Sequence, residues 1–171
     1  MRSKHLTRTI GLGIVALCVA GVATLTIMPG LTASAAELKQ GGVVLENLLK
    51  REQILINNQQ QRLTLSDEAV PAAHQWIADL QAEGKDTTAL QTALAAFQAG
   101  IGQAQTSFDA AKQALDTHAG FDASGKVTNA TQALKTLVDA GRAERQFHLT
   151  ITQATIDARA AVRAYRQANQ P

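Results

Sequence analysis

The sequence predicts an all-α fold: an up-down-up-down four-helix bundle preceded by an N-terminal signal or anchor segment. Three observations favour this class. Proline and aromatic residues are scarce, with 3 prolines and 4% Phe, Trp and Tyr among 171 residues. No stretch alternates apolar and polar residues for long enough to indicate a strand. Apolar residues recur instead at spacings of three and four, the pattern of amphipathic helices that pack in a bundle.

Residues 1–35 have the layout of a secretory signal. The segment opens with three basic residues, Arg2, Lys4 and Arg8. An uncharged apolar run over 10–28, a Pro-Gly break and an Ala-Ser-Ala tripeptide follow, which together predict cleavage after Ala35. The run is also about as long as a bilayer span, so an uncleaved membrane anchor is the alternative. In both cases the basic end stays inside, and we expect residues 36–171 to be periplasmic or extracellular.

Composition excludes several functions for the domain over 36–171. The single cysteine, Cys18, lies in the apolar run, so the domain sequence offers no disulfide, thiolate nucleophile, Cys-ligated zinc or c-type haem attachment. The chain has a net charge of +2, but three of its sixteen bases precede Ala36, which leaves thirteen bases against fourteen acids in the domain. The basic character therefore belongs to the leader and predicts no nucleic-acid binding.

Two helices are predicted to open the domain. The first spans about 36–62 and ends in the polar run Asn-Asn-Gln-Gln-Gln over 57–61. Its apolar contacts come from Leu38, Leu45, Leu48, Leu49, Leu55 and Ile56. The second spans about 66–83, where Ser-Asp-Glu gives a capping sequence, Pro71 falls near the first turn and a glycine follows the end.

The third predicted helix, about 87–117, has an uninterrupted seam at alternating spacings of four and three. The seam consists of Leu90, Leu94, Phe97, Ile101, Ala104, Phe108, Ala111 and Leu115. Asp86 is predicted to cap its start.

The fourth predicted helix spans about 128–169, with Asn129 as its capping residue. Its stripe is Val127, Ala130, Leu134, Leu137, Gly141, Phe147, Ile151, Ala154, Ala158, Val162 and Tyr165. The stripe changes phase around 142–146, which predicts a bend or register change there. Because the second helix is short, we expect the third and fourth helices to project beyond it as a hairpin, by about 20 Å.

No catalytic, cofactor-binding or metal-binding residue is predicted. Di-iron bundles need Glu-x-x-His on two helices, and no acid here has a histidine three residues later. The sequence therefore favours a non-enzymatic protein without a cofactor.

Two groups of residues are candidates for binding a partner. The expected hairpin tip contains His118, Phe121 and Lys126, and the end of the fourth helix contains Arg159, Arg163, Tyr165 and Arg166. The arginines suit a partner's carboxylates or another anionic surface. The simpler interpretation is that they complement the negative end of the helix dipole.

A possible polar cluster lies in the phase shift of the fourth helix, at Arg142, Glu144, Arg145 and His148. One interpretation is a buried group that binds a ligand or moves a proton. The other, which we favour, is a solvent-facing Glu144–His148 pair at helical spacing.

One short segment, Leu-Thr-Ile-Thr-Gln over 149–153, resembles the L-T-x-x-Q motif of small periplasmic helical chaperones. In that family the motif begins helices, whereas this copy falls inside a predicted helix. No family is therefore assigned.

The sequence thus predicts an exported, non-enzymatic helical bundle that acts as an interaction or scaffold module. The expected partner is another protein or a second copy of the chain, and membrane contact is expected only through residues 10–28 if the leader stays attached. The alternatives are a periplasmic chaperone-like holdase and a small-ligand carrier with a site near Glu144 and His148.

Overall fold

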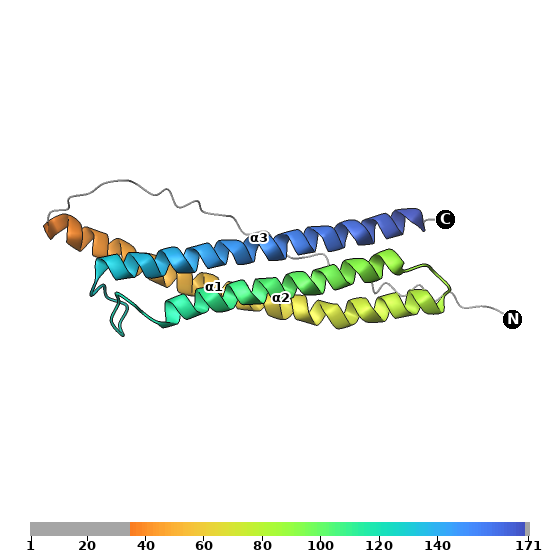
Figure 1. The fold of residues 1–171 in the computed structure, drawn as a ribbon, viewed down its shortest axis with the longest axis horizontal. Helices are drawn as coiled ribbons and strands as arrows, with labels where there is room; N and C mark the ends of the chain where they lie inside the picture. Colours follow the sequence, from red (N-terminus) through yellow and green to blue (C-terminus); the bar gives the residue numbers. More distant parts are fainter. Residues whose placement is uncertain (1–34, 170–171) are drawn as a thin grey trace, which may run out of the picture. The chain divides into compact units, whose positions relative to one another are not determined.

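The computed structural model describes residues 35–169, with side chains from residue 41 onward. This part of the chain contains three helices: α1 (Ala35–Ala82), α2 (Thr88–Asp116) and α3 (Ala130–Ala168). They lie side by side, with α1 and α3 running in one direction and α2 in the other (Figure 1). The all-α prediction is confirmed. The predicted signal or anchor, including the apolar run over 10–28, lies outside the described residues.

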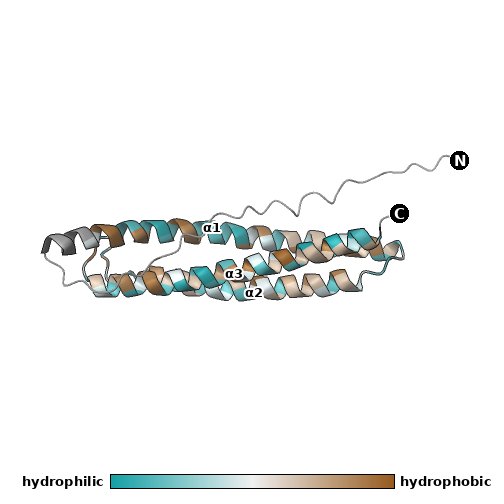
Figure 2. Ribbon diagram, turned by 90° about the horizontal axis from the view of Figure 1, so that it is seen from above, coloured by the Kyte–Doolittle hydropathy of each residue, from teal (hydrophilic) through white to brown (hydrophobic). Residues whose placement is uncertain are grey.

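The four-helix prediction is wrong for the described residues, because the helices predicted over 36–62 and 66–83 form the single helix α1. The polar run over 57–61 does not end the helix. All its side chains except Gln59 are exposed to water, and glutamine is a good helix former. Figure 2 shows the mostly hydrophilic middle of α1 in teal.

Two features that predicted a helix start lie inside α1 instead. The hydroxyl of Ser66 donates a hydrogen bond to the backbone carbonyl of Arg62, at 2.8 Å, so it bonds back into its own helix. Pro71 occupies an exposed position within the helix. Its missing N–H therefore leaves a backbone carbonyl open to water, not buried.

The predicted projection of the α2–α3 hairpin is wrong as well, because α1 has 48 residues and runs beside both ends of the hairpin. At one end Lys126 Nζ lies 2.8 Å from Glu46 Oε2. At the other end Trp76 contacts Tyr165 edge to face, with 5.9 Å between the ring centroids.

Three apolar clusters fill the interior along the helices. The first contains Leu49, Leu115, Phe121, Ala133, Leu137 and Ala140. The second contains Leu63, Ile101, Ala104, Phe108, Phe147 and Ile151. The third contains Ile77, Leu90 and Leu94, with Trp76, Val162 and Tyr165 packed against it.

The predicted third helix is confirmed as α2, which buries seven of the eight predicted seam residues. The eighth, Phe97, is half-buried and packs against two clusters. The helix starts where Asp86 Oδ1 accepts a hydrogen bond from the Thr88 N–H at 2.9 Å. Gly100 permits a close approach of α3, because a Cβ there would lie 2.6 Å from the Cβ of Ala154.

The predicted fourth helix is confirmed as α3, and Asn129 caps its start by accepting from the Gln132 N–H at 3.1 Å. The predicted register change is wrong. The residues that α3 buries at regular four-three spacing are Ala133, Leu137, Ala140, Glu144, Phe147 and Ile151. Predicted stripe members Ala130 and Leu134 are exposed. The phase shift arises because an acid, Glu144, occupies a core position.

Candidate functional site

The middle of α1 carries a buried row of polar side chains. Positions at seven-residue intervals along one face are Leu45, Glu52, Gln59, Ser66, Ala73 and Leu80. The row is apolar at both ends, whereas Glu52, Gln59 and Ser66 in its middle are buried polar residues. Buried acids and amides are uncommon in protein interiors and need a partner.

Helix α3 faces this row with polar residues of its own. We use the name polar layer for Glu52, Gln59, Arg62 and Ser66 of α1 together with Glu144 and His148 of α3. Two direct pairings join the helices within the polar layer, Glu52 with Glu144 and Arg62 with His148.

The first pairing brings two buried carboxyl groups together. Glu52 is 4% exposed and Glu144 is 5% exposed, and their side chains share a hydrogen bond. Burial, followed by the hydrogen bond and negative charge of Glu52, raises the pKa of Glu144 to about 9, against a small lowering by Arg51. Glu144 is therefore protonated at neutral pH and donates the hydrogen bond to Glu52. Its Oε1 atom has no hydrogen-bond partner.

The second pairing joins a guanidinium and an imidazole. Arg62 Nη1 lies 3.2 Å from His148 Nδ1, and the Arg62 guanidinium lies 5.8 Å from the centroid of the Phe147 ring. Burial and then the charge of Arg62 lower the pKa of His148. Burial also lowers the pKa of Arg62. His148 is therefore neutral at neutral pH, and its Nδ1 accepts a hydrogen bond from Arg62.

The structure divides the predicted polar cluster into two pairs. Glu144 and His148 belong to the polar layer, but they bind different residues of α1, so the favoured solvent-facing Glu144–His148 pair is wrong. Arg142 and Arg145 are exposed on the other side of α3. Glu52, Gln59 and Arg62 were not among the residues predicted from the sequence. The seven-residue repeat of α1, continuous from Leu45 to Leu80, was the signal that could have found the first two.

The structure divides the predicted hairpin-tip residues between the core and the surface. Phe121 is buried in the first apolar cluster, and Lys126 is paired with Glu46 of α1. The pairing with Lys126 lowers the pKa of Glu46. His118 is half-buried, and its Nδ1 lies 3.2 Å from the backbone carbonyl of Asp116. Helix α1 thus contacts the loop at Phe121 and Lys126, whereas most residues of 117–129 are exposed.

The predicted arginine and tyrosine group at the end of α3 is also divided. Tyr165 packs on Trp76 of α1, and its hydroxyl is buried without a hydrogen-bond partner. Arg159 is half-buried, whereas Arg163 and Arg166 are exposed.

Large hydrophobic side chains are exposed on two of the three helices. Among the residues with described side chains they are Val43, Val44, Ile54, Leu65, Leu134, Val138, Leu149 and Ile156, at 39 to 61% exposure. The first four lie on α1 and the last four on α3, and α2 contributes none to this group. The large hydrophobic residues of α2 are thus buried or half-buried, whereas several of those on α1 and α3 are exposed.

Exposed arginines lie on the same face of α3 as three of its exposed apolar residues. The outer stripe of α3, as we call it, consists of Val138, Arg142, Arg145, Leu149, Ile156 and Arg163. Their spacings of 4, 3, 4, 7 and 7 keep them on one side of a helix. The outer stripe is both apolar and basic.

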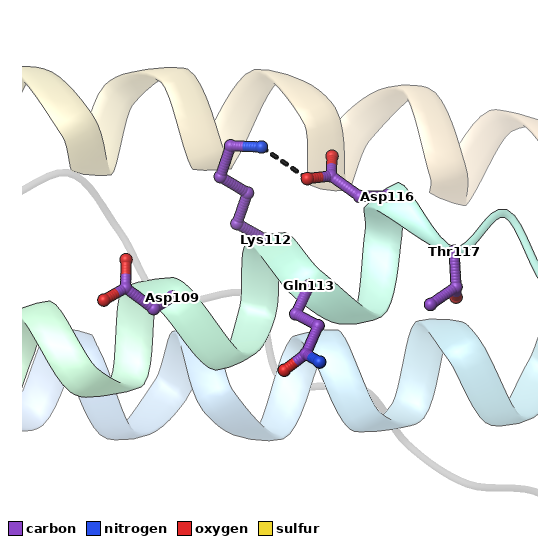
Figure 3. A pocket seen from close by; sticks show the side chains of 5 residues that line it. All are labelled: Asp109, Lys112, Gln113, Asp116 and Thr117. Atoms are coloured by element: carbon purple, nitrogen blue, oxygen red, sulfur yellow. Dashed lines mark hydrogen bonds and ion pairs between the residues drawn. The ribbon is translucent and has the colours of Figure 1, made fainter.

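Two surface depressions lie away from the polar layer. Figure 3 shows one of them, lined by residues from the last turns of α2, where Lys112 and Asp116 form an ion pair. The other lies between α1 and α2 and is lined by Pro71, His74, Gln75, Ile77, Ala78, Gln81, Gln91, Leu94, Ala95 and Gln98. Neither includes Glu144 or His148, the residues of the predicted carrier site.

Within the described part of the chain, no three His, Cys, Asp or Glu side chains are grouped so as to hold a metal ion. None of the helices described combines the length and apolar character that a membrane span requires. Comparison with protein-family models, with curated proteins and with solved structures finds no match to this chain.

Proposed function

We propose that this chain is a non-enzymatic, exported scaffold protein that binds a partner protein along the outer stripe of α3. The observation that carries the proposal is the uneven distribution of exposed hydrophobic residues, which occur on α1 and α3 but not on α2. Exposed apolar side chains in line along a helix are typical of surfaces that bind another helix.

The charge of α3 favours an acidic partner. The helix has six basic residues, and of its three acids Glu144 is buried in protonated form while Asp139 is paired with Lys135. Arg142 and Arg145 lie between Val138 and Leu149 on the outer stripe. An amphipathic helix with acidic flanks would place apolar residues on the hydrophobic positions and carboxylates on the arginines.

Site-specific photocrosslinking in cells tests this proposal. A photoreactive residue at Leu149 or at Ile156 of the full chain is expected to give a protein adduct of defined mass. The same residue at Ala95, exposed on α2, is the matched control and is expected to give none. Adducts to lipid only, equal adducts at all three positions, or no adduct would contradict the proposal.

Charge reversal then tests the partner's chemistry. The double variant Arg142→Glu/Arg145→Glu changes exposed residues only, so it is expected to fold normally and to lose the Leu149 adduct. Retention of the adduct at wild-type yield would argue against acidic recognition.

The holdase and carrier alternatives make different predictions. A holdase would suppress the aggregation of an unrelated unfolded protein, and charge reversal on the outer stripe would not abolish this. A carrier would need a ligand to reach Glu144 and His148, and both already bind residues of α1. An adduct with twice the mass of the chain would identify self-association as the function of this surface.

A further inference from the structure

The attachment of α1 to the other two helices has a weak point in its middle. One row of α1 residues at seven-residue spacing is apolar throughout: Leu49, Ile56, Leu63, Val70 and Ile77. The parallel row becomes polar at Glu52, Gln59 and Ser66. Helix α2 has no such interruption, and it packs more extensively against α3 than α1 does. The middle of α1 is therefore held by polar as well as apolar contacts.

Within the polar layer, Glu52 and Glu144 can lie side by side at low energy only if they share a proton. Two carboxylates side by side in a buried site repel each other, and burial disfavours both charges. One shared proton converts the repulsion into a hydrogen bond between α1 and α3. The Oε1 atom of Glu144 has no hydrogen-bond partner that would stabilise a full negative charge.

Among the described residues, no positively charged group near Glu52 and Glu144 offsets their repulsion when the shared proton is lost. On α1, Arg51 attracts Glu144 only weakly, and Arg62 is engaged with His148. The buried residues of α2 are Leu90, Leu94, Ile101, Ala104, Phe108, Ala111 and Leu115, none of them ionisable. On α3, Arg142 and Arg145 are exposed and His148 is turned toward Arg62.

We infer that the Glu52–Glu144 pair is a proton-dependent latch that holds α1 against the α2–α3 hairpin and releases it when the shared proton is lost. The inference concerns the packing of α1 and stands whether or not the outer stripe of α3 binds a partner.

The direction of the pH effect follows from proton linkage. The pKa of Glu144 is about 9 in the folded protein and 4.5 as its ordinary value, so the folded state binds more protons between these values. The stabilisation of the folded state by protonated Glu144 is complete below pH 4.5 and is lost as the pH rises through about 9. The pKa of His148 is lowered, so His148 has the opposite effect and destabilises the folded state as the pH falls. This effect is confined to pH values below the ordinary pKa of 6.5. The window from pH 7 to 9.5 therefore lies above the range in which His148 contributes.

Hydrogen exchange of the full chain, measured by mass spectrometry at pH 7 and pH 9.5, tests the latch. After correction for the intrinsic exchange rate, peptides from α1 are expected to lose protection by up to about tenfold per pH unit, the limit for one proton. Peptides from α2 and α3 are expected to change less. Equal loss in all three helices, or no loss in α1, would overturn the inference.

Variants separate the latch from general alkaline unfolding. Glu144→Gln keeps the shape and a hydrogen-bond donor without a charge, so α1 protection is expected to become independent of pH in this window. Glu52→Gln removes the charge that repels a deprotonated Glu144, so it is expected to reduce the pH dependence of α1 protection. This second variant keeps the test valid if Glu144→Gln folds poorly. Glu68→Gln, at an exposed position of α1, is the matched control and should behave as wild type. Wild-type pH dependence in both buried variants would contradict the latch.

Discussion

At the scale of single residues, burial distinguishes side chains of the same chemical type. Phe147 is fully buried in the second apolar cluster, in contact with Phe108 at 6.5 Å between ring centroids. Leu149, two residues further, is 53% exposed on the outer stripe of α3. We therefore expect Phe147 to contribute to the stability of the fold and Leu149 to contribute to the proposed binding of a partner protein.

Truncation of these two residues is expected to have unequal effects on folding. Phe147→Ala should lower the free energy of unfolding by about 3–5 kcal/mol, since it leaves a cavity in a packed cluster. Leu149→Ala should change it by less than about 0.5 kcal/mol. Urea denaturation followed by circular dichroism measures both. A large loss in Leu149→Ala would show that its side chain is buried.

Two glycines of α2 give a second contrast of this kind. Gly102→Ala should stabilise the protein by about 1 kcal/mol, because the new methyl group enters open space and alanine is the better helix former. Gly100→Ala should be destabilising, because the methyl group would overlap Ala154 of α3. Urea denaturation again gives both values. Equal stabilisation by the two variants would argue against the close approach of α2 and α3.

At the scale of elements, the continuity of α1 is the largest difference from the sequence-based expectation. A helix end was predicted within 62–66, where the chain is polar and a capping sequence follows. The structure continues the helix through this segment and uses Gln59 and Ser66 as buried residues. Helical continuity here is what lets α1 contact both ends of the hairpin.

A proline placed in this segment tests that continuity. Thr64→Pro should lower the free energy of unfolding by about 3 kcal/mol or more, because proline breaks a helix interior. Thr64→Ala is the control and should have little effect, since Thr64 is exposed. Both follow from thermal or urea unfolding. Tolerance of Thr64→Pro would instead support two separate helices.

At the scale of the whole molecule, the described residues form one three-helix unit in which α1 is attached less extensively than the other two helices. Of the residues predicted to meet a partner at the two ends, α1 contacts Phe121, Lys126 and Tyr165, whereas Lys126, Arg163 and Arg166 are exposed. The outer stripe of α3, along the side, is exposed and combines apolar with basic residues. Arg142 and Arg145 are exposed on this stripe, whereas their sequence neighbours Glu144 and His148 contact α1.

The proposed location outside the cytoplasmic membrane has a direct test. On expression of the full chain in a bacterial host, we expect a soluble exported species whose intact mass corresponds to a start at Ala36. A membrane-bound species that begins near Met1 would instead identify residues 10–28 as an anchor. A product in the cytoplasmic fraction would contradict export.

The sequence by itself determined the all-α class, the bounds of α2 and α3 to within two residues, and the seam of α2. These depend on local periodicity and capping, which are visible along the chain. It also placed Glu144 and His148 at an irregular point of the last helix, although the irregularity was a polar residue in a core position and no change of register.

Only the tertiary structure decided that α1 is continuous and that Glu144 is paired with Glu52. The local signals within 62–66 favour a helix break, so the continuity was not visible along the chain. The pairing joins positions about ninety residues apart, and nothing in the local pattern encodes which partner a buried polar residue meets. A glutamate, a glutamine and a serine in one heptad row resemble a solvated surface until a second helix buries them. In the folded protein Glu52, Gln59 and Ser66 are buried, while their polar neighbours in α1 stay exposed.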